Sequence, residues 1–353
     1  MTMENINRRK FIGSGLAAAA SLSVGSSFAS GLKPESVTLK RNDEHPFNPR
    51  TINSMPTNSL GRTGYKVGIL SLGAQAAVET PGMEDEAERI INRAIDLGIN
   101  YIDTAASYGR GLSQRNVGRA MRTRRSEVFL ASKTHDRTYD GSMRLLEESL
   151  NSLQTDHLDV WQFHNVQRKD QLDQIFADDG AMKAMQKAKA EGMIRYIGIS
   201  GHFEPLVLLD AVDRYPFDLV LLAVNAADVH YLSFKNYLLP ELQRREIATV
   251  GMKVATRGRM LSSWTPPPLD EQPARLATSL PGTINIKEAL TYNMSLPVST
   301  TIIGVDDVAQ IEEDVKIASE FSPLSEAQMK EIEYKTLPIV RQGLYFRRWD
   351  LGA

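Results

Sequence analysis

The chain has 353 residues, 42% of them hydrophobic, which is enough to bury a large core in one big domain or two ordinary ones. The formal net charge is −2 and the predicted folded part contains no basic block, so charge gives no reason to expect nucleic-acid binding. There are no cysteines, which excludes disulfides, thiolate catalysis and cysteine-ligated metals. No two histidines have metal-ligand spacing on a helix, so we predict no metal site.

The N-terminus predicts an export signal over residues 1–29. The stretch NRRKFIG places Arg8 and Arg9 before an aromatic residue, and a mildly apolar stretch rich in Ala, Gly and Ser then ends in Ser27-Phe28-Ala29. This order is typical of a twin-arginine signal, and it predicts the twin-arginine export machinery as a partner and a periplasmic location. The apolar stretch is too weak for a stable membrane span, and after removal of the signal we expect no stable span in the mature protein. A tail with a chance arginine pair is the alternative interpretation.

Residues 30–55 are interpreted as a polar linker, and from Leu60 onward β-rich runs alternate with helix-like stretches. One such stretch, MEDEAERIINRAIDLG, has apolar residues at helical spacing and ends at Gly98. Eight runs separated by helices predict an α/β fold, a (β/α)8 TIM barrel, over residues 56–340. An open doubly wound sheet is the alternative, and the absence of GxGxxG after the first run weakens it. The runs are VGILSLG, GINYIDT, SEVFLASK, LDVWQFHN, IRYIGIS, FDLVLLAVN, IATVGMK and STTIIGV.

Three further segments complete the predicted organisation. LGRTGYKVG (60–68), with its Arg-Thr-Gly turn, predicts a short N-terminal β-hairpin before the first barrel strand. The stretch from Ala255 to Thr283 contains three consecutive prolines and predicts a long loop after strand 7, a length typical of loops that cover a ligand. Residues 341–353 are interpreted as a C-terminal tail that either closes a pocket or lies in solvent.

Polar residues close five of the apolar runs. Each one alone could be a strand end meeting water, but the carboxyl ends of the strands of a (β/α)8 barrel form a single rim, where active sites are built. We therefore expect these side chains to converge, with Tyr108 held nearby by the small-residue stretch TAASYGRG. The five residues are Asp103, Lys133, His164, Ser200 and Lys253.

These motifs resemble the aldo-keto reductase family. DTAASYG, ASKTH, WQFHN, IGISGH and TTIIGVDDVAQIEED occur in the family's order, and the resemblance runs from about Pro56 to Phe321. It implies a TIM barrel that transfers a hydride between NADP or NAD and an aldehyde, a ketone or a sugar. The family's catalytic tetrad corresponds to Asp103, Tyr108, Lys133 and His164.

The chemistry of hydride transfer explains these four residue types. A carbonyl that accepts a hydride needs a proton donor at its oxygen, a role we assign to the hydroxyl of Tyr108 as general acid/base. That hydroxyl normally titrates near pH ~10, and we expect the Lys133 ammonium to lower its pKa. Asp103 is expected to hold Lys133 charged, and His164 to orient the carbonyl.

The resemblance also implies cofactor contacts, with two departures. Ser200 corresponds to the family's carboxamide-binding serine, but Gly201 and Leu221 stand where the family has asparagine and glutamine. The remaining contacts are implied on the pyrophosphate side and the adenosine side, where an aspartate replaces the usual asparagine at position 314. They are Lys253, Arg257 and Arg259 after strand 7, and Gly304, Gln310, Glu313 and Asp314 after strand 8.

Asp306 and Asp307 leave the cofactor open. They stand where family members often bind the 2′-phosphate of NADP, and two carboxylates would repel that phosphate, so NAD competes with the family's usual NADP. Capping of the following helix is an equally good interpretation.

Two other function classes fit the sequence less well than an oxidoreductase. A redox-silent NAD(P)-binding or regulatory barrel has no need of Lys133 and Asp103 together. A different barrel chemistry, such as hydrolysis, lacks a carboxylate pair at the rim. The substrate itself has no readable code in the sequence.

Overall fold

The computed structural model describes residues 45–272 and 280–349. The predicted signal over 1–29, and residues 30–44 of the predicted linker, lie outside the described residues. Residues 273–279 of the predicted long loop and 350–353 of the predicted tail also lie outside them. None of the helices in the two described ranges is both long enough and apolar enough to cross a bilayer.

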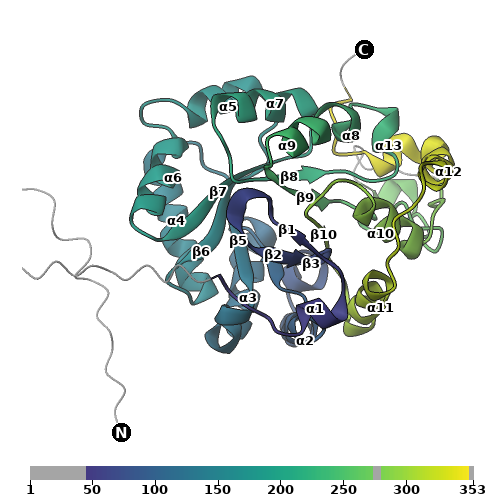
Figure 1. Cartoon of the computed structure of the whole chain (residues 1–353), viewed down its shortest axis with the longest axis horizontal. Coiled ribbons are helices and arrows are strands. Elements are labelled where there is room, and N and C mark those ends of the chain that lie inside the picture. Colours follow the sequence, from purple (N-terminus) through teal and green to yellow (C-terminus); the bar gives the residue numbers. More distant parts are fainter. Residues whose placement is uncertain (1–44, 273–279, 350–353) are drawn as a thin grey trace, which may run out of the picture. The chain divides into compact units, whose positions relative to one another are not determined.

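Eight parallel strands close into a barrel, which confirms the predicted (β/α)8 fold (Figure 1). Neighbouring strands follow chain order, and the last pairs with the first in the register Thr301 to Leu70. The strands are β3 (Leu70–Gly73), β4 (Tyr101–Asp103), β5 (Phe129–Thr134), β6 (Leu158–Phe163), β7 (Ile194–Gly201), β8 (Leu219–Ala223), β9 (Ala248–Met252) and β10 (Thr300–Ile303).

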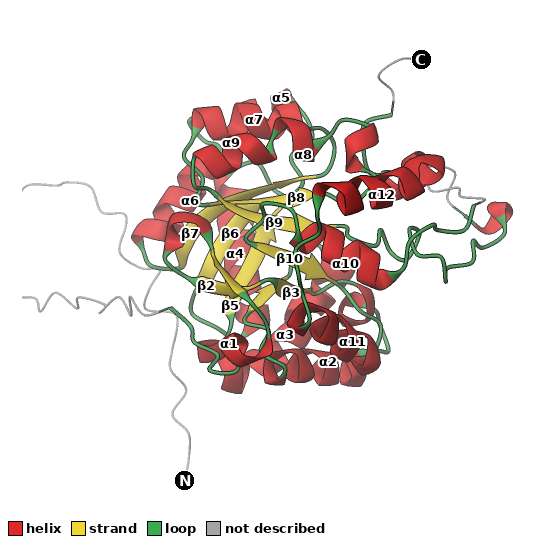
Figure 2. Cartoon of the chain, turned by 45° about the vertical axis from the view of Figure 1, so that its right-hand side comes forward, coloured by secondary structure: helices red, strands yellow, loops and turns green. Residues whose placement is uncertain are grey.

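Helices surround the strands, and their apolar faces pack inward (Figure 2). In α2 (Glu84–Asp96) the apolar stripe is fully buried, while three acidic residues in its first turn favour the positive end of the helix dipole. The other helices are α3 (Leu112–Arg124), α4 (Tyr139–Leu153), α5 (Lys169–Ile175), α6 (Ala181–Ala190), α7 (Pro205–Arg214), α8 (Phe234–Tyr237), α9 (Leu239–Arg244), α10 (Ile286–Met294), α11 (Val308–Ser319), α12 (Glu326–Thr336) and α13 (Val340–Gly343).

The end of the barrel formed by the strand N-termini is plugged. A hairpin is present, formed by the antiparallel strands β1 (Thr57–Ser59) and β2 (Lys66–Gly68). Its first strand lies before the predicted segment 60–68, which supplies the turn and the second strand. Tyr65 of its turn packs on Phe129 inside the barrel, with ring centroids 4.8 Å apart. The plug leaves the opposite end, where the strands terminate, as the place for a ligand.

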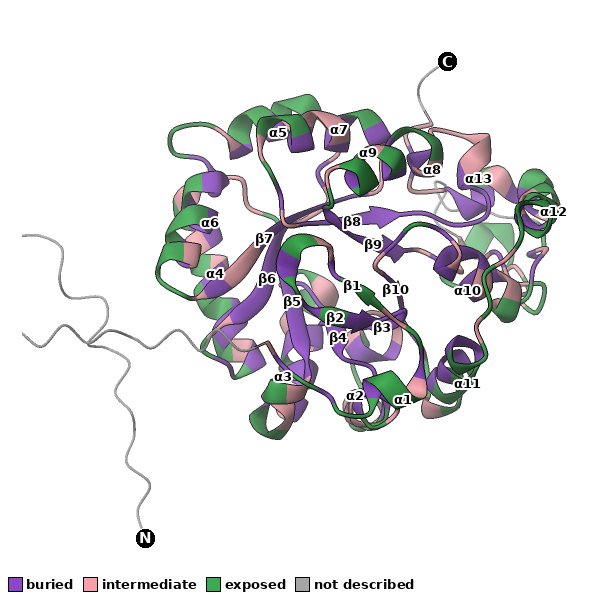
Figure 3. Cartoon of the chain, in the orientation of Figure 1, coloured by how far each residue is buried: buried purple, intermediate pink, exposed green. Residues whose placement is uncertain are grey.

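Part of the predicted linker is folded. Residues 45–55 contain the short helix α1 (Thr51–Ser54), and the Asn48 amide donates to the Ile95 carbonyl over 2.8 Å. Asn48 and Met55 are buried, so this segment belongs to the packed unit. The barrel strands of that unit are coloured purple, as buried, in Figure 3. Polar residues such as Asn48 suggest an exposed linker. They can be buried here because the side-chain amide donates to backbone carbonyls instead of to water.

The described part of the C-terminal tail is docked too. Arg347 is buried and donates to the Ala223 carbonyl at the end of β8 over 2.9 Å. It also pairs with the buried carboxylate of Asp228. Residues 341–349 are therefore anchored at the same end of the barrel as the strand C-termini.

Candidate active site

Five predicted site residues lie at one end of the barrel because they follow or end parallel strands. Asp103 ends β4 and Lys133 is the last residue but one of β5, while Ser200 is near the end of β7. His164 and Lys253 directly follow β6 and β9. The closed parallel topology places all five on one rim.

Lys133 is the centre of a buried polar network. Its ammonium forms a salt bridge with Asp103, and both side chains are 1% exposed. It also donates to the Thr104 carbonyl over 2.9 Å and to the Tyr108 hydroxyl over 3.2 Å. The Gln162 amide donates to the other oxygen of Asp103 over 2.9 Å. Although burial lowers the pKa of Lys133, Asp103 and Tyr108 outweigh that effect and raise it, so the ammonium stays charged.

A strained turn presents Tyr108 to this ammonium. Gly109 and Arg110 both have left-handed φ angles, 53° and 54°. A Cβ at Gly109 would meet the Glu79 carbonyl oxygen at 2.3 Å, so only glycine fits there. The Lys133 ammonium then lies 4.6 Å from the centre of the Tyr108 ring.

The expected direction of the Tyr108 pKa differs in the structure. Burial raises it above its usual value, and Lys133 offsets only part of that increase. The sequence could place a cation nearby but could not weigh it against burial. The consequence is a hydroxyl that holds its proton at neutral pH.

His164 completes the predicted tetrad from the next strand. Its ring lies edge-on to Tyr108 with centroids 5.6 Å apart, and its Nδ1 is 3.3 Å from the Ser107 hydroxyl. Burial lowers the pKa of His164 well below its usual value, and Lys133 and Arg137 lower it further. The imidazole is therefore neutral at pH 7 and can serve as a hydrogen-bonding group rather than a cation.

A cavity of about 320 Å³ opens beside His164. Every residue that lines it is polar: Ser107, His135, Arg137, His164, Asn165, Gln167 and Gln171. This is the hollow that borders the tetrad, because it includes both His164 and the neighbour of Tyr108.

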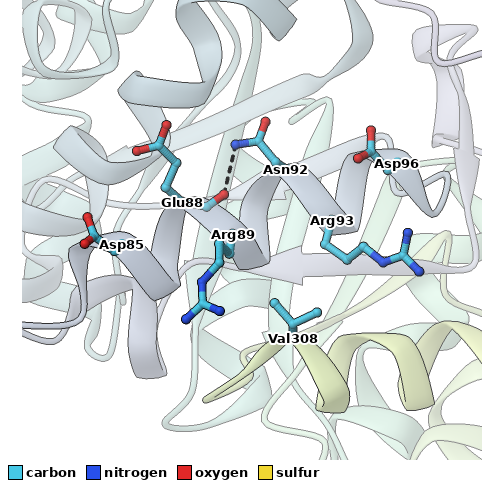
Figure 4. Close-up of a pocket in the computed structure, with 7 residues that line it drawn as sticks. All are labelled: Asp85, Glu88, Arg89, Asn92, Arg93, Asp96 and Val308. Carbon is cyan, nitrogen blue, oxygen red and sulfur yellow. Dashed lines mark hydrogen bonds between the residues drawn. The ribbon is translucent and has the colours of Figure 1, made fainter.

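A second hollow, of about 620 Å³, lies away from the strand ends (Figure 4). Its side chains come from the outer face of α2 and the start of α11, where Arg93 pairs with Glu312 over 2.7 Å. These exposed ion pairs belong to a solvated surface. None of the tetrad residues lines this hollow.

On the expected nicotinamide side, Ser200 is already engaged. Its hydroxyl accepts from the Asn165 backbone N–H over 2.9 Å and donates to the Phe163 carbonyl over 3.1 Å. It is fully buried, so in this structure it connects β6 to β7. Its predicted contact with a carboxamide remains a prediction.

The expected pyrophosphate side carries cations. The Lys253 ammonium has an uncharged partner, the Gln75 amide oxygen at 3.0 Å. Burial, and then the nearby Arg257 and Lys133 charges, lower the pKa of Lys253 to about 8. The Arg259 guanidinium lies between the rings of Trp264 and Tyr345, 5.6 and 5.4 Å from their centres. Neither cation has a carboxylate partner in the part of the chain that the structure describes, and such cations suit an anionic cofactor group.

The expected adenosine side begins at the N-terminus of α11. Asp307 caps this helix, its carboxylate accepting from the Gln310 N–H over 2.9 Å. The side-chain oxygen of Gln310 accepts from the Asp306 N–H over 3.0 Å. Gly304 and Asp306 are exposed, so the capping interpretation accounts for Asp307 and leaves Asp306 available to a ligand.

Asp314 lies two turns along the same helix and is 2% exposed, whereas Glu313 is exposed. Its Oδ2 is buried and has no hydrogen-bond partner among the described residues. Burial, with a smaller contribution from Glu313, raises the pKa of Asp314 to about 7. Because this pKa is close to neutral pH, the carboxyl can carry its proton and present both a donor and an acceptor, as an asparagine does. The residues on both sides therefore fit a nicotinamide dinucleotide.

Two residues of the network were missed. Gln162 could have been found, because it interrupts an apolar run two positions before His164 and so shares its side of the strand. Arg137 gave no such signal, since it sits in the polar segment between β5 and α4. No group of three or more His, Asp or Glu side chains suited to a metal occurs among the described residues.

Residues 67–336 match the family model described as the Aldo/keto reductase family. The chain belongs to this family. It is accordingly an NAD(P)-dependent oxidoreductase that acts on carbonyl or alcohol groups.

Individual relatives agree with this aldo/keto reductase assignment. L-Galactose dehydrogenase of Arabidopsis thaliana is 29% identical over 313 residues, 80% of this chain and 94% of that protein. An aldo-keto reductase from Bacillus halodurans, in its holo form, superimposes with a TM-score of 0.65 at 26% identity, covering 80% of this chain and 96% of that one. One from Klebsiella pneumoniae, in complex with NADPH, has a TM-score of 0.61 at 21% identity and covers 78% and 94%.

Proposed function

We propose that this aldo/keto reductase uses NADP to reduce the carbonyl group of a sugar-type substrate, or to oxidise the corresponding alcohol, with Tyr108 as the general acid/base. The observation that carries the proposal is the Lys133 ammonium, which reaches both the Asp103 carboxylate and the Tyr108 hydroxyl. The sugar class is supported by the likeness to L-galactose dehydrogenase over most of both chains.

The protein's residues divide the work of the reduction. The bound cofactor supplies the hydride to the carbonyl carbon. Tyr108 gives its proton to the carbonyl oxygen, and the neighbouring ammonium of Lys133 stabilises the tyrosinate that remains. Asp103 and Gln162 hold Lys133 in place and keep it charged. Oxidation of an alcohol runs the same steps in reverse.

His164 is assigned to the orientation of the carbonyl. Its neutral ring carries one N–H. If the Ser107 hydroxyl donates to Nδ1, the proton lies on Nε2 and is available to the substrate oxygen. A cation at this place would compete with Tyr108 as proton donor, and burial beside Lys133 prevents that.

NADP is proposed on two grounds: the Klebsiella relative was crystallised with NADPH, and Lys253 and Arg259 supply positive charge on the phosphate side. The exposed carboxylate of Asp306 is expected to reduce the preference for NADP over NAD, because it repels a 2′-phosphate.

A fluorescence titration with NADPH and NADH, followed by absorbance assays with aldehydes and sugars, tests the proposal. Tight binding with turnover of a carbonyl substrate is the expected result. Binding without turnover of any substrate would favour the redox-silent alternative. Failure to bind either dinucleotide would refute the cofactor assignment.

We further propose that the protein is exported folded to the periplasm by the twin-arginine route, on the basis of Arg8, Arg9 and the Ser27-Phe28-Ala29 end of the signal. Since the cofactor is made in the cytoplasm, it would be loaded before export and retained. Cell fractionation should find the wild type in the periplasm with bound cofactor, and a variant with both arginines changed to lysine in the cytoplasm. A periplasmic location for both proteins would contradict the route.

A further inference from the structure

Arg137 lines the polar cavity beside His164 and has an unused hydrogen-bond donor. Arg137 donates through Nη2 to the His164 carbonyl over 2.6 Å, which fixes the guanidinium beside the tetrad. Its Nη1 is buried and has no hydrogen-bond partner among the described residues. A buried guanidinium N–H without a partner is costly, so its position calls for a ligand that accepts from it.

The neighbouring carboxylate does not neutralise Arg137. Oδ1 of Asp136 accepts from the Thr138 N–H over 2.8 Å and from the Thr138 hydroxyl over 2.7 Å. No ion pair joins Asp136 to Arg137 within the described ranges. Burial accordingly lowers the pKa of Arg137 to about 10, which still leaves it charged at neutral pH.

The lining of the cavity carries a cation, Arg137. None of its lining residues is a carboxylate. Lys133 is neutralised by Asp103, whereas the partner of Lys253 among the described residues is the uncharged Gln75 amide, so positive charge is left over on this rim. Of the other carboxylates nearby, Asp136 accepts from Thr138, and Glu79 lies 3.6 Å from Arg257. An anionic group would enter this cavity favourably.

The remaining lining groups suit a ligand rich in oxygen. The side-chain amide oxygen of Gln171 accepts from the Gln167 backbone N–H over 2.8 Å, which leaves the NH₂ group of the Gln171 side chain as a donor. With hydroxyl and amide groups on every side, an apolar ligand would bury polar groups without partners. Hydroxyls and a carboxylate would satisfy them.

We propose that the cavity selects a polyhydroxylated aldehyde or ketone that carries a carboxylate, a sugar acid, with the carboxylate against Arg137 and the reacting carbonyl at Tyr108 and His164. The proposal rests on the proposed reductase function. Arg137 is thereby the residue that determines specificity, because its guanidinium can donate both to the His164 carbonyl and to the ligand.

The test compares glucuronate with glucose as a matched pair that differs in the carboxylate. For the wild type, kcat/KM should favour glucuronate by more than about tenfold, as expected for one hydrogen bond to a charged group. Arg137→Gln should reduce that ratio by at least about tenfold, mainly through KM. Arg137→Lys, which keeps the charge, should retain part of it. Arg144→Gln, an exposed change on α4 outside the cavity lining, should keep the wild-type ratio.

Calorimetric titration of the wild type with gluconate and with sorbitol gives a readout that needs no turnover. Gluconate should bind more tightly, and Arg137→Gln should remove the difference. A wild type that treats both members of each pair alike would overturn the proposal even if Arg137→Gln fails to fold. If 4-nitrobenzaldehyde, glucuronate and glucose are all left unreduced, the proposed function fails, while the gluconate titration still decides the role of Arg137.

Discussion

Two fully buried ion pairs lie near the same end of the barrel and do different work. Asp103 and Lys133 are 1% exposed, and Asp228 and Arg347 are 0% exposed. Lys133 reaches the ionisable hydroxyl of Tyr108 as its further side-chain partner. Arg347 instead donates to backbone carbonyls, those of His202 over 2.8 Å and Ala223 over 2.9 Å.

The difference separates a pair that we propose acts in catalysis, Asp103 with Lys133, from a structural pair, Asp228 with Arg347. Burial costs both pairs several kcal/mol, so neither is explained by its Coulomb attraction alone. The Asp228 carboxylate also accepts from the N–H groups of Phe234 and Lys235, which ties α8 to the C-terminal segment. Breaking that pair should cost folding stability, and disturbing the other should cost turnover.

The largest expected effect comes from the structural pair. Asp228→Ala leaves the Arg347 guanidinium buried and unpaired, and should lower the free energy of unfolding by about 3–5 kcal/mol. Urea unfolding measures the loss. The double variant Asp228→Ala with Arg347→Met should recover part of it, because no buried charge remains. A single variant within about 1 kcal/mol of the wild type would remove the distinction between the pairs.

The pair of Asp103 and Lys133 is probed through its neighbour, the Tyr108 hydroxyl. Tyr108→Phe should lower kcat at least about a hundredfold, while cofactor binding and stability stay near wild type. Tyr101→Phe is the matched control, because its hydroxyl is buried without a partner among the described residues and lies outside the cavity. Near-normal turnover by Tyr108→Phe would take the proton-donor role from this residue.

Asp314 extends the comparison to a buried acid that has no cation. Because its pKa of about 7 exceeds the ordinary value of 3.8, the folded state binds an extra proton between those pH values, and stability falls as pH rises through 7. The shift corresponds to about 4 kcal/mol at most, and relaxation around the site should leave about 2.

Between pH 5 and pH 8 the wild type should lose about 2 kcal/mol of unfolding free energy relative to Asp314→Asn, which has no proton to lose at this position. Denaturant titrations of both proteins at the two pH values provide the measurement. A difference between the proteins that is independent of pH would show that Asp314 titrates normally.

The smallest effect is expected at the exposed acid. Asp306→Lys should raise affinity for NADP relative to NAD by about tenfold, which is about 1.4 kcal/mol, and Asp306→Asn by less. Fluorescence titration with the reduced cofactors gives both dissociation constants. Asp307 is left unchanged because it caps α11. An unchanged ratio would mean that Asp306 does not face the phosphate.

Much of this arrangement is readable from the sequence. Alternating β-rich runs and amphipathic helical stretches predicted the barrel, because buried faces of strands and helices require apolar residues at regular spacings in the sequence. The same logic predicted that Asp103, Lys133 and His164 would meet, because parallel strands bring their ends to one rim. The geometry brings Tyr108 to them as well.

Other features depend on three-dimensional surroundings that periodicity does not carry. The raised pKa of Tyr108 depends on how deeply its ring is buried. The unused donor on Arg137 depends on which acceptors lie around Nη1 in the folded protein. Residues 45–55 and 341–349 looked like polar ends, and both dock through side-chain bonds to backbone carbonyls, as Asn48 does with Ile95 and Arg347 with Ala223.

Closure of the barrel has a consequence for how the protein is made. The hydroxyls of Ser71 and Thr300 lie 2.7 Å apart, although 229 positions separate them in the chain. A ribosome must release the chain through β10 before β3 can find its second neighbour. Until then both edges of the sheet lie open to other chains, and such long-range pairing is slow. Chaperones that bind nascent chains therefore have the longest opportunity to act on β3.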